Sequence, residues 1–334
     1  EVISHVEQED IEAMGTFLKE VPCSVCEASS NLIFDIQITL YHGEDNASVR
    51  ITDFHTNLVH VSRNGEILLA KEITGKEESA LADKSTLTIE NIFAFAKKVD
   101  LADVREVLER QVRYNMAIAE EGLCGNYGAN IGKVLLATYG DQDVKVRAKA
   151  MAAAGSDARM NGCELPVVIN SGSGNQGICA TMPVVVFAEE NHNTDEELVR
   201  ALMLSHLTAI YIKQSLGVLS ALCGCVVAST GSSCGITYLM GGKYEQVSYA
   251  VKNMIANLTG MICDGAKPSC ALKLTSGVST AVLSAMLAMQ QKCVSSVEGI
   301  IDDDVDKSIH NLTSIGAEAM NETDRKVLEI MTHK

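Results

Sequence analysis

Residues 1–100 carry the alternation of apolar and polar side chains that is typical of β-strands. In residues 32–41, apolar side chains occupy every second position from 34 to 40, which predicts a half-buried strand. The dipeptide Asn64-Gly65 separates two further apolar runs, and it is a strong signal for a tight hairpin. The predicted strands cover residues 32–41, 47–52, 58–62 and 66–70. We therefore expect a small antiparallel sheet of about four strands.

From residue 100 onward the apolar positions take helical spacing. Asp100 is the expected N-cap of a helix over residues 101–121, which ends near Gly122. Further helices are expected at residues 89–98, 144–154, 195–215, 244–258, 280–291 and 303–320. The fold class is thus α+β: a small antiparallel α+β domain, residues 1–100, followed by a larger all-α domain, residues 101–334.

Two long segments, residues 165–188 and 215–242, carry no charge. Both are rich in Gly, Ser, Asn, Thr and Cys, and neither holds about twenty predominantly apolar residues in a row. We interpret them as buried segments of a helical core. The net charge of −16 also argues against nucleic acid or an anionic membrane as partner, because both require a basic surface. The first ten residues are acidic, unlike a signal peptide, and we expect a cytoplasmic protein.

Eleven cysteines are present, and they do not form the evenly spaced framework of a small disulfide-rich domain. Cys263 and Cys270 differ from the others because a loop with Gly265 and Pro268 separates them. Together with Cys223 they could supply three thiolates to an iron–sulfur cluster. Spacing alone leaves Cys225 and Cys234 available as well, and it leaves open that all are unligated buried thiols. The remaining cysteines are interpreted as structural: Cys23 and Cys26, which form Cys-x-x-Cys, and Cys124, Cys163, Cys179 and Cys293.

A glycine-rich loop, Asn170-Ser-Gly-Ser-Gly-Asn-Gln-Gly177, lies between two apolar segments. It is neither a dinucleotide fingerprint nor a phosphate loop, but its backbone N–H groups could hold a carboxylate. A surface turn is the alternative. Arg159, just upstream, could clamp the same carboxylate or pair with Asp157. The expected substrate-binding residues are Arg159, Ser171, Ser173, Asn175 and Gln176.

Among the histidines, His55 is the candidate catalytic residue, because Thr56 and Asn57 give it polar neighbours where a strand begins. His206 lies on an apolar helix, and a single histidine on such a face is more often structural. The identity of the base that removes a proton from the substrate stays open at this point.

Several motifs give the chain a family resemblance. They are Ser-Asp-Ala-Arg-Met (156–160), the 170–177 loop, Ala-Thr-Met-Pro-Val-Val-Val (180–186), Leu-Ser-Ala-Leu-Cys (219–223) and Gly-Met-Ile-Cys-Asp-Gly-Ala (260–266). With these motifs the sequence resembles the serine dehydratase alpha-chain-like family, which includes L-cysteine desulfidases. His55-Thr-Asn, Glu121-Gly-Leu and residues 323–331 extend the resemblance over nearly the whole chain.

The resemblance implies an oxygen-labile [4Fe–4S] enzyme with Cys223, Cys263 and Cys270 as ligands. It implies a β-eliminating lyase that converts L-cysteine to pyruvate, ammonia and sulfide through a non-redox cluster. L-serine dehydratase activity by the same mechanism is one alternative, and an amino-acid-binding relative without a cluster is another. The oligomeric state stays open, with a homo-oligomer as one option.

The sequence departs from the family in one respect. Family members carry an N-terminal segment with a Gly-Cys-Thr-Glu-Pro motif, which this sequence lacks. We therefore expect an N-terminal fragment to be missing and the α+β domain to be incomplete at its N-terminus. This departure leaves the activity of the chain alone open.

Overall fold

The computed structural model describes residues 8–30, 32, 34–53, 56–73, 86–217 and 220–333. The chain forms two compact units: residues 1–83 with 325–334, and residues 84–324. The predicted class, a small antiparallel sheet followed by a mostly helical region, is confirmed. The predicted division into domains of residues 1–100 and 101–334 stays a prediction.

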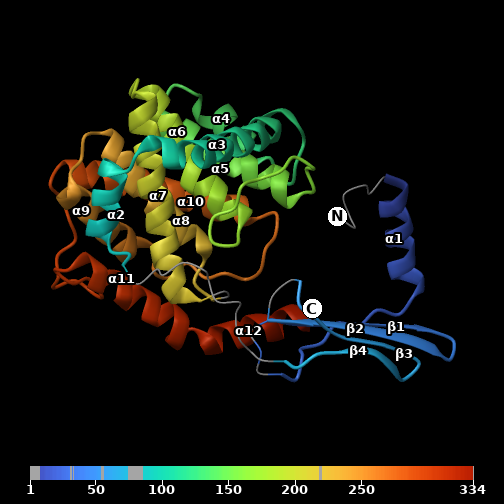
Figure 1. Cartoon of the computed structure of the whole chain (residues 1–334). Helices are drawn as coiled ribbons and strands as arrows, with labels where there is room; N and C mark the ends of the chain where they lie inside the picture. The colour runs from blue at the N-terminus through green and yellow to red at the C-terminus, as the bar shows by residue number, and fades with distance from the viewer. Residues whose placement is uncertain are drawn as a thin grey trace. The chain divides into compact units, whose positions relative to one another are not determined.

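The first unit contains a four-stranded antiparallel sheet in the order β1-β2-β3-β4 (Figure 1). Asn64 and Gly65 form the turn between β3 and β4 with φ values of 50° and 83°. Two successive positive φ angles match the twist of a tight hairpin, which explains why this dipeptide is a reliable signal. The elements of the unit are α1 (Gln8–Glu20), β1 (Asp35–His42), β2 (Asp45–Thr52), β3 (Leu58–Arg63) and β4 (Glu66–Ala70).

One face of this sheet is apolar but not buried. Ile36, Ile38 and Leu40 of β1 are 46%, 60% and 64% exposed, so the prediction of a half-buried strand is wrong for the described residues. The alternation itself is correct, because Ile36 pairs with Ile51 and Ile38 pairs with Val49 across the β1–β2 ladder. The sequence pattern identifies the face of a strand but not what covers it.

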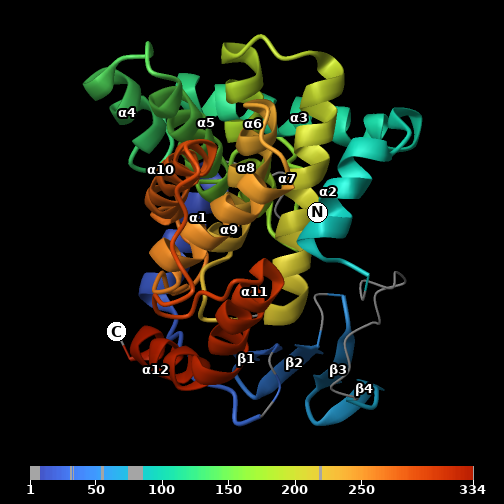
Figure 2. The ribbon, with the colours of Figure 1, turned by 90° about the vertical axis from the view of Figure 1, so that its left-hand side faces the viewer.

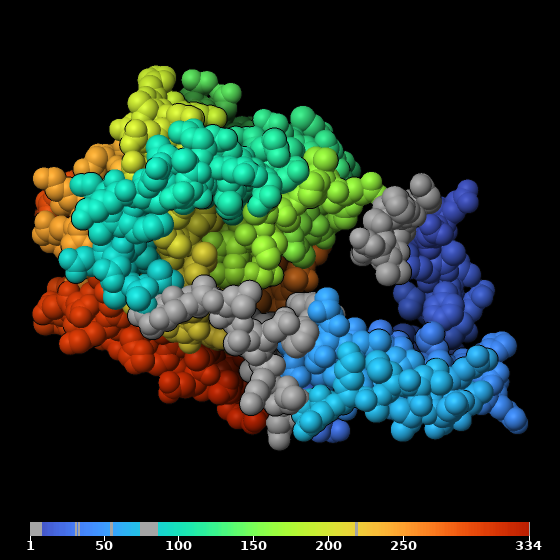
Figure 3. Space-filling view, in the orientation of Figure 1, coloured from blue at the N-terminus to red at the C-terminus, as the bar shows by residue number. Residues whose placement is uncertain are grey.

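The second unit consists of packed α-helices (Figures 1 and 2). Helices α2 and α3 form part of its outer surface (Figure 3). After α11 the chain continues through a π-helical turn (Ile315–Ala319) into α12 (Asn321–Thr332), whose residues from Arg325 onward belong to the first unit. The helices are α2 (Ile89–Lys98), α3 (Leu101–Cys124), α4 (Ile131–Tyr139), α5 (Val144–Met160), α6 (Gly174–Glu190), α7 (Asp195–Leu216), α8 (Gly224–Leu239), α9 (Tyr244–Leu258), α10 (Cys270–Met289) and α11 (Val305–Ser314).

Helix α8 is the centre of the helical unit and packs against α6, α7, α9 and α10. Its small residues allow neighbouring backbones to approach closely. A Cβ atom on Gly231 would lie 2.3 Å from the carbonyl oxygen of Ser205, and one on Gly235 would lie 3.0 Å from that of Ala201. Such close packing explains how the unit buries its surface with few aromatic side chains.

Among the described residues, α10 is the one helix long and apolar enough to cross a membrane by these two criteria. Half of its apolar window is buried inside the structure, as for the core helix of a globular unit, so this finding is weak evidence for a membrane span.

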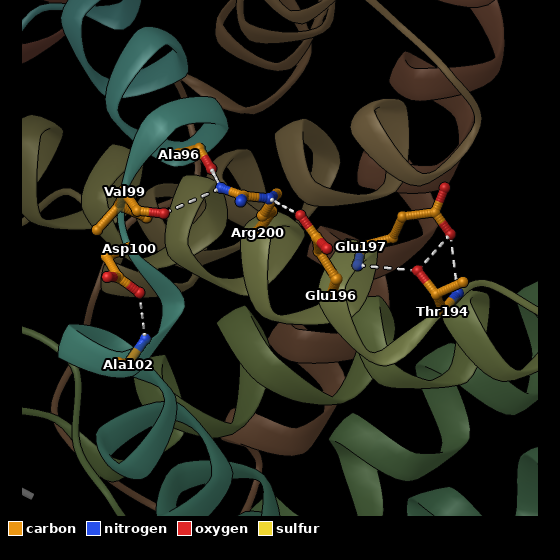
Figure 4. Close-up of polar contacts among 8 residues, drawn as sticks. All are labelled: Ala96, Val99, Asp100, Ala102, Thr194, Glu196, Glu197 and Arg200. Carbon is orange, nitrogen blue, oxygen red and sulfur yellow. Dashed lines mark hydrogen bonds and ion pairs between the residues drawn. The ribbon is translucent and has the colours of Figure 1, made fainter.

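Polar contacts fix the ends of three helices near the start of the helical unit (Figure 4). The Arg200 guanidinium donates to the carbonyl oxygens of Ala96 and Val99, at 2.8 and 3.4 Å, and to the Glu196 carboxylate at 2.9 Å. A cation at the C-terminal end of α2 satisfies carbonyls that have no partner within the helix. Asp100 caps α3, and Thr194 forms a capping box with Glu197 at the start of α7.

Arg200→Met is expected to lower the free energy of unfolding by about 1.5–3 kcal/mol, because the charge-assisted bonds to α2 are lost while an apolar stem remains. Urea denaturation followed by helical circular dichroism measures this change. Arg110→Met, at an exposed position of α3, is the matched control. Equal stabilities of the two variants would contradict the capping role.

Candidate active site

A short antiparallel bridge brings Cys223 and Cys263 together. The Cys223 N–H donates to the carbonyl oxygen of Met261 at 3.0 Å, and the Cys263 N–H donates to that of Ala221 at 2.6 Å. Cys223 is the N-cap of α8, and Cys263 lies in the loop that leads to α10. Two of the three cysteines that the resemblance implies as ligands therefore lie side by side, although they are forty positions apart in the sequence.

The two thiols share one hydrogen bond, and this bond shifts their pKa values in opposite directions. The hydrogen bond from the Cys223 thiol lowers the pKa of Cys263 to about 6, with help from the Gly265 N–H and the Lys273 ammonium. The same hydrogen bond, together with burial, raises the pKa of Cys223 far above the ordinary thiol value. Cys263 is thus the thiol that ionises first, and a thiolate is the form that binds metal.

Lys273 holds the cysteine loop against α10. Its ammonium donates to the carbonyl oxygen of Ile262 at 2.8 Å and forms an ion pair with Asp264. Lys267 pairs with the same carboxylate, and the two ammonium groups lower the pKa of Asp264 to about 2. Both ion pairs thus meet at Asp264, which they fasten within the loop, through Lys267, and to α10, through Lys273.

Cys270, the third predicted ligand, is the first residue of α10. Its sulfur lies 3.9 Å from the carbonyl oxygen of Gly265, while the N–H of the same glycine contacts the Cys263 sulfur. Cys263 and Cys270 thus both contact Gly265. Helix α5 packs against α10, and the Arg159 guanidinium at its end acts electrostatically on Cys270.

The glycine-rich loop begins with a tight turn. Asn170 and Ser173 exchange two backbone hydrogen bonds of 3.1 Å, and the residues between them, Ser171 and Gly172, have φ values of 47° and 84°. Two positive φ angles in sequence define the same kind of turn as in the β3–β4 hairpin. Ser173 then caps α6 by accepting from the Gln176 N–H.

The first turn of α6 contacts both Arg159 and the cysteine site. Arg159 donates to the Asn175 side-chain oxygen at 3.2 Å, and a Cβ on Gly174 would lie 2.3 Å from the guanidinium Nε. The Gln176 side chain lies against Gly224, beside Cys223, where an added Cβ would come within 2.8 Å of it. The predicted substrate-binding residues and the predicted ligands therefore meet in one place.

The N-terminal ends of three helices converge at this place: α6, α8 and α10. The Cys225 thiol of α8 contacts both the carbonyl oxygen of Lys273 in α10, at 3.0 Å, and the Cys179 thiol of α6. Each helix N-terminus carries a partial positive charge. With Arg159 and Lys273 added, the site favours an anionic ligand within an otherwise acidic protein.

The side chains at this site are of the type that binds an iron–sulfur cluster. Cys223, Cys263 and Cys270 lie around one loop, and thiolates are the ligands that such clusters take. Among the described residues, no three His, Cys, Asp or Glu side chains are arranged to hold a metal ion. The fit therefore rests on the types of side chain that meet and not on a ligand geometry.

The structure excludes one of the two interpretations of Arg159, the ion pair with Asp157, while the carboxylate clamp stays a prediction. Asp157 is buried, and its carboxylate accepts from the Gly132 N–H at 3.2 Å, so it caps α4 instead of pairing with Arg159. Burial lowers the pKa of Arg159, whose hydrogen-bonded oxygen partner is Asn175. His55, the predicted catalytic residue, lies outside the described residues, and its role stays a prediction.

Sequence reasoning missed two contributors to the site. Lys273 is one, and the signal for it was its spacing of one helical turn from Cys270. His206 is the other: it is 6% exposed and contacts Asn170, the first residue of the loop, and Thr181 in α6. Burial lowers the pKa of His206 to about 4.

His206 is expected to make stability depend on pH. The unfolded chain binds a proton near pH 6.5 that the folded chain does not bind until about pH 4, so stability falls as the pH drops through this window. Between pH 7 and pH 5 the loss from this group is about 2 kcal/mol. Urea denaturation of His206→Asn at pH 7 and at pH 5 should show a loss of stability that is smaller by this amount.

His192→Asn, at an exposed position, is the control and should keep the full pH dependence of the unchanged protein. Parallel stability profiles for His206→Asn and the unchanged protein would contradict a buried neutral imidazole.

Comparison with known proteins places the chain in a family. The family model described as serine dehydratase alpha chain matches residues 2–329. The UPF0597 protein of Phocaeicola vulgatus is 58% identical over 304 residues, which is 90% of this chain and 70% of that protein. The UPF0597 protein of Bacteroides thetaiotaomicron is 55% identical over 341 residues, which is 100% of this chain and 79% of that protein. This chain belongs to the serine dehydratase alpha chain family and is related to its amino-acid lyases.

Proposed function

We propose that this protein is an iron–sulfur-dependent lyase that eliminates sulfide from L-cysteine, yielding pyruvate and ammonia. The observation that carries the proposal is the meeting of three cysteines with Arg159 at three converging helix N-termini. Such a site can hold a negatively charged cluster and a substrate carboxylate at the same time.

Cys223, Cys263 and Cys270 would hold a [4Fe–4S] cluster, as the resemblance implies. When bound, the cluster supplies a Lewis acid that makes the β-substituent of the amino acid a better leaving group. Lys273 and the first turn of α10 offset the negative charge of the thiolates, since the ammonium acts on both Cys223 and Cys263. The chain thus offsets the negative charge of the thiolates without a further side chain bound to the cluster.

The substrate carboxylate is assigned to Arg159 and the first turn of α6. The guanidinium is half-buried, and Asn175 accepts one of its hydrogen bonds, which leaves further N–H groups for a bidentate contact. Ser171, Ser173 and Gln176 supply additional polar groups on the same turn and helix end. A carboxylate bound there places the amino acid beside Cys223, because Gln176 contacts Gly224.

The reaction needs a base for the α-proton, and His55 is the proposed residue. Removing this proton and breaking the Cβ–S bond gives the enamine and sulfide. The enamine takes up a proton at carbon, and water then converts the resulting imine to pyruvate and ammonia. L-serine differs only by oxygen in place of sulfur, so both amino acids belong in the same assay.

Cys223→Ser is expected to prevent cluster assembly, because it removes one of three thiolates. The protein is reconstituted anaerobically, and bound iron, visible thiolate-to-iron absorbance and sulfide release are measured. Cys234→Ser, in the same helix α8, is the matched control and should keep all three signals. Unchanged iron content and absorbance in Cys223→Ser would show that the ligand assignment is wrong.

Arg159→Gln is expected to raise the KM for L-cysteine by roughly 10- to 100-fold, the loss of a charged hydrogen-bond pair, with a smaller effect on kcat. Arg147→Gln on the same helix is the control, because Arg147 pairs with the surface residue Glu190. An unchanged KM in Arg159→Gln would show that the substrate carboxylate does not bind at the 170–177 loop.

Faster turnover of L-serine than of L-cysteine would show that L-serine, and not L-cysteine, is the preferred substrate.

A further inference from the structure

His206 lies in α7 and takes no part in the chemistry proposed above. It is buried between α3, α6 and the 170–177 loop, and its ring contacts three polar side chains. Asn170 Nδ2 lies 3.0 Å from His206 Nδ1, and Gln111 Nε2 lies 3.4 Å from the same nitrogen. Thr181 Oγ1 lies 3.3 Å from His206 Nε2.

These contacts fix the tautomer of the imidazole. The same Asn170 side-chain atom lies 3.3 Å from the backbone carbonyl oxygen of His206. A carbonyl oxygen can only accept a hydrogen bond, so this atom must be the amide nitrogen Nδ2, which donates. His206 Nδ1 must then accept, and the ring proton lies on Nε2. Thr181 fits this assignment, because its own hydroxyl donates to the Gly177 carbonyl oxygen at 2.6 Å and its oxygen is left to accept from Nε2.

The orientation of Asn170 determines the turn that follows it. With its amide nitrogen directed at His206, the Asn170 Oδ1 accepts from the Ser171 hydroxyl at 2.9 Å. Asn170 also forms both backbone hydrogen bonds with Ser173, the residue that caps α6. The ring Nδ1 and the backbone carbonyl oxygen of His206 therefore together orient the side chain that organises the turn and the start of α6.

A second clamp holds the segment before the turn. Asn115 of α3 donates to the Val168 carbonyl oxygen at 3.1 Å and accepts from the Val168 N–H at 2.9 Å. This clamp fixes Val168 but makes no bond to Asn170. The turn itself thus depends on His206, while the strand-like segment before it does not.

We propose that His206 is a positioning residue, whose neutral Nδ1 holds Asn170 and thereby sets the Ser171–Ser173 turn toward the substrate carboxylate. That His206 holds Asn170 is the first part of the proposal and concerns the folded chain alone. That the turn faces the substrate carboxylate is the second part and rests on the function proposed above. The two parts are tested by separate measurements.

Two variants separate positioning from packing. In His206→Asn, the short amide can place an oxygen near the position of Nδ1 and accept from Asn170. In His206→Gln, the longer amide reaches the position of Nε2 and leaves Asn170 without this acceptor. Gln is the larger residue and leaves the smaller cavity, so a purely structural role predicts that it is the better replacement.

Hydrogen exchange of the intact protein tests the first part without substrate. We expect the Asn170 and Ser173 amides to exchange about tenfold faster in His206→Gln than in the unchanged protein, and at a nearly unchanged rate in His206→Asn. Slower exchange in His206→Gln than in His206→Asn, or equal rates in all three proteins, would overturn the proposal.

Steady-state kinetics with L-cysteine test the second part. His206→Gln should raise KM by about tenfold with kcat nearly unchanged, and His206→Asn should leave both near their normal values. If the exchange rates follow the expected order but KM does not change, the turn does not bind the carboxylate and this part is overturned. Absence of turnover in the unchanged protein would count against the proposed function, while the exchange rates would still decide the role of His206.

Discussion

The close approach of α6, α8 and α10 at their N-terminal ends is the constraint on which the rest of the site depends. Two glycines permit it. Cβ atoms on Gly224 and Gly277 would lie 2.8 Å and 2.6 Å from the Gln176 and Cys225 side chains. A third, Gly177, lets α6 approach the segment before the 170–177 loop, because its Cβ would lie 2.0 Å from the Val168 carbonyl oxygen. A larger residue at any of these positions would displace the atoms packed against it, so close packing favours glycine there.

The convergence of the three helix N-termini also lowers the electrostatic cost of thiolates in the site. Thiolates in a half-buried site are costly, and the protein as a whole is acidic. Helix N-termini, Arg159 and Lys273 supply local positive charge. The pKa of Cys263 is lowered first by the hydrogen bond from Cys223, and the Lys273 ammonium contributes to the same shift. The loop ion pairs at Asp264 keep Lys273 beside the thiols, where an unrestrained lysine would extend into water.

The sequence predicts the strands, α3, α7 and α9 well, because alternation, helical spacing and caps act locally. It assigns α6 and α8 only to buried segments of a helical core, residues 165–188 and 215–242, and does not predict the bounds of either helix. Gly174, Gly177 and Pro183 in α6 read as helix breakers, and α8 is buried on all sides, so neither shows an amphipathic period. The family motifs identify Arg159 and the cysteines, but the contact between Gln176 and Gly224 depends on packing that no local pattern contains. His206 was interpreted as structural because a single histidine on an apolar helix face usually is. Its three polar partners come from separate segments, and no local pattern brings them together.

The central claim is that these cysteines hold a cluster with one iron open to the substrate. Mössbauer spectroscopy of protein reconstituted anaerobically with ⁵⁷Fe tests it most directly, because it resolves the iron sites of a cluster. The account predicts a [4Fe–4S] spectrum in which a single iron site changes when L-cysteine is added. Absence of a cluster, or turnover of L-cysteine with every iron site unchanged, would contradict it.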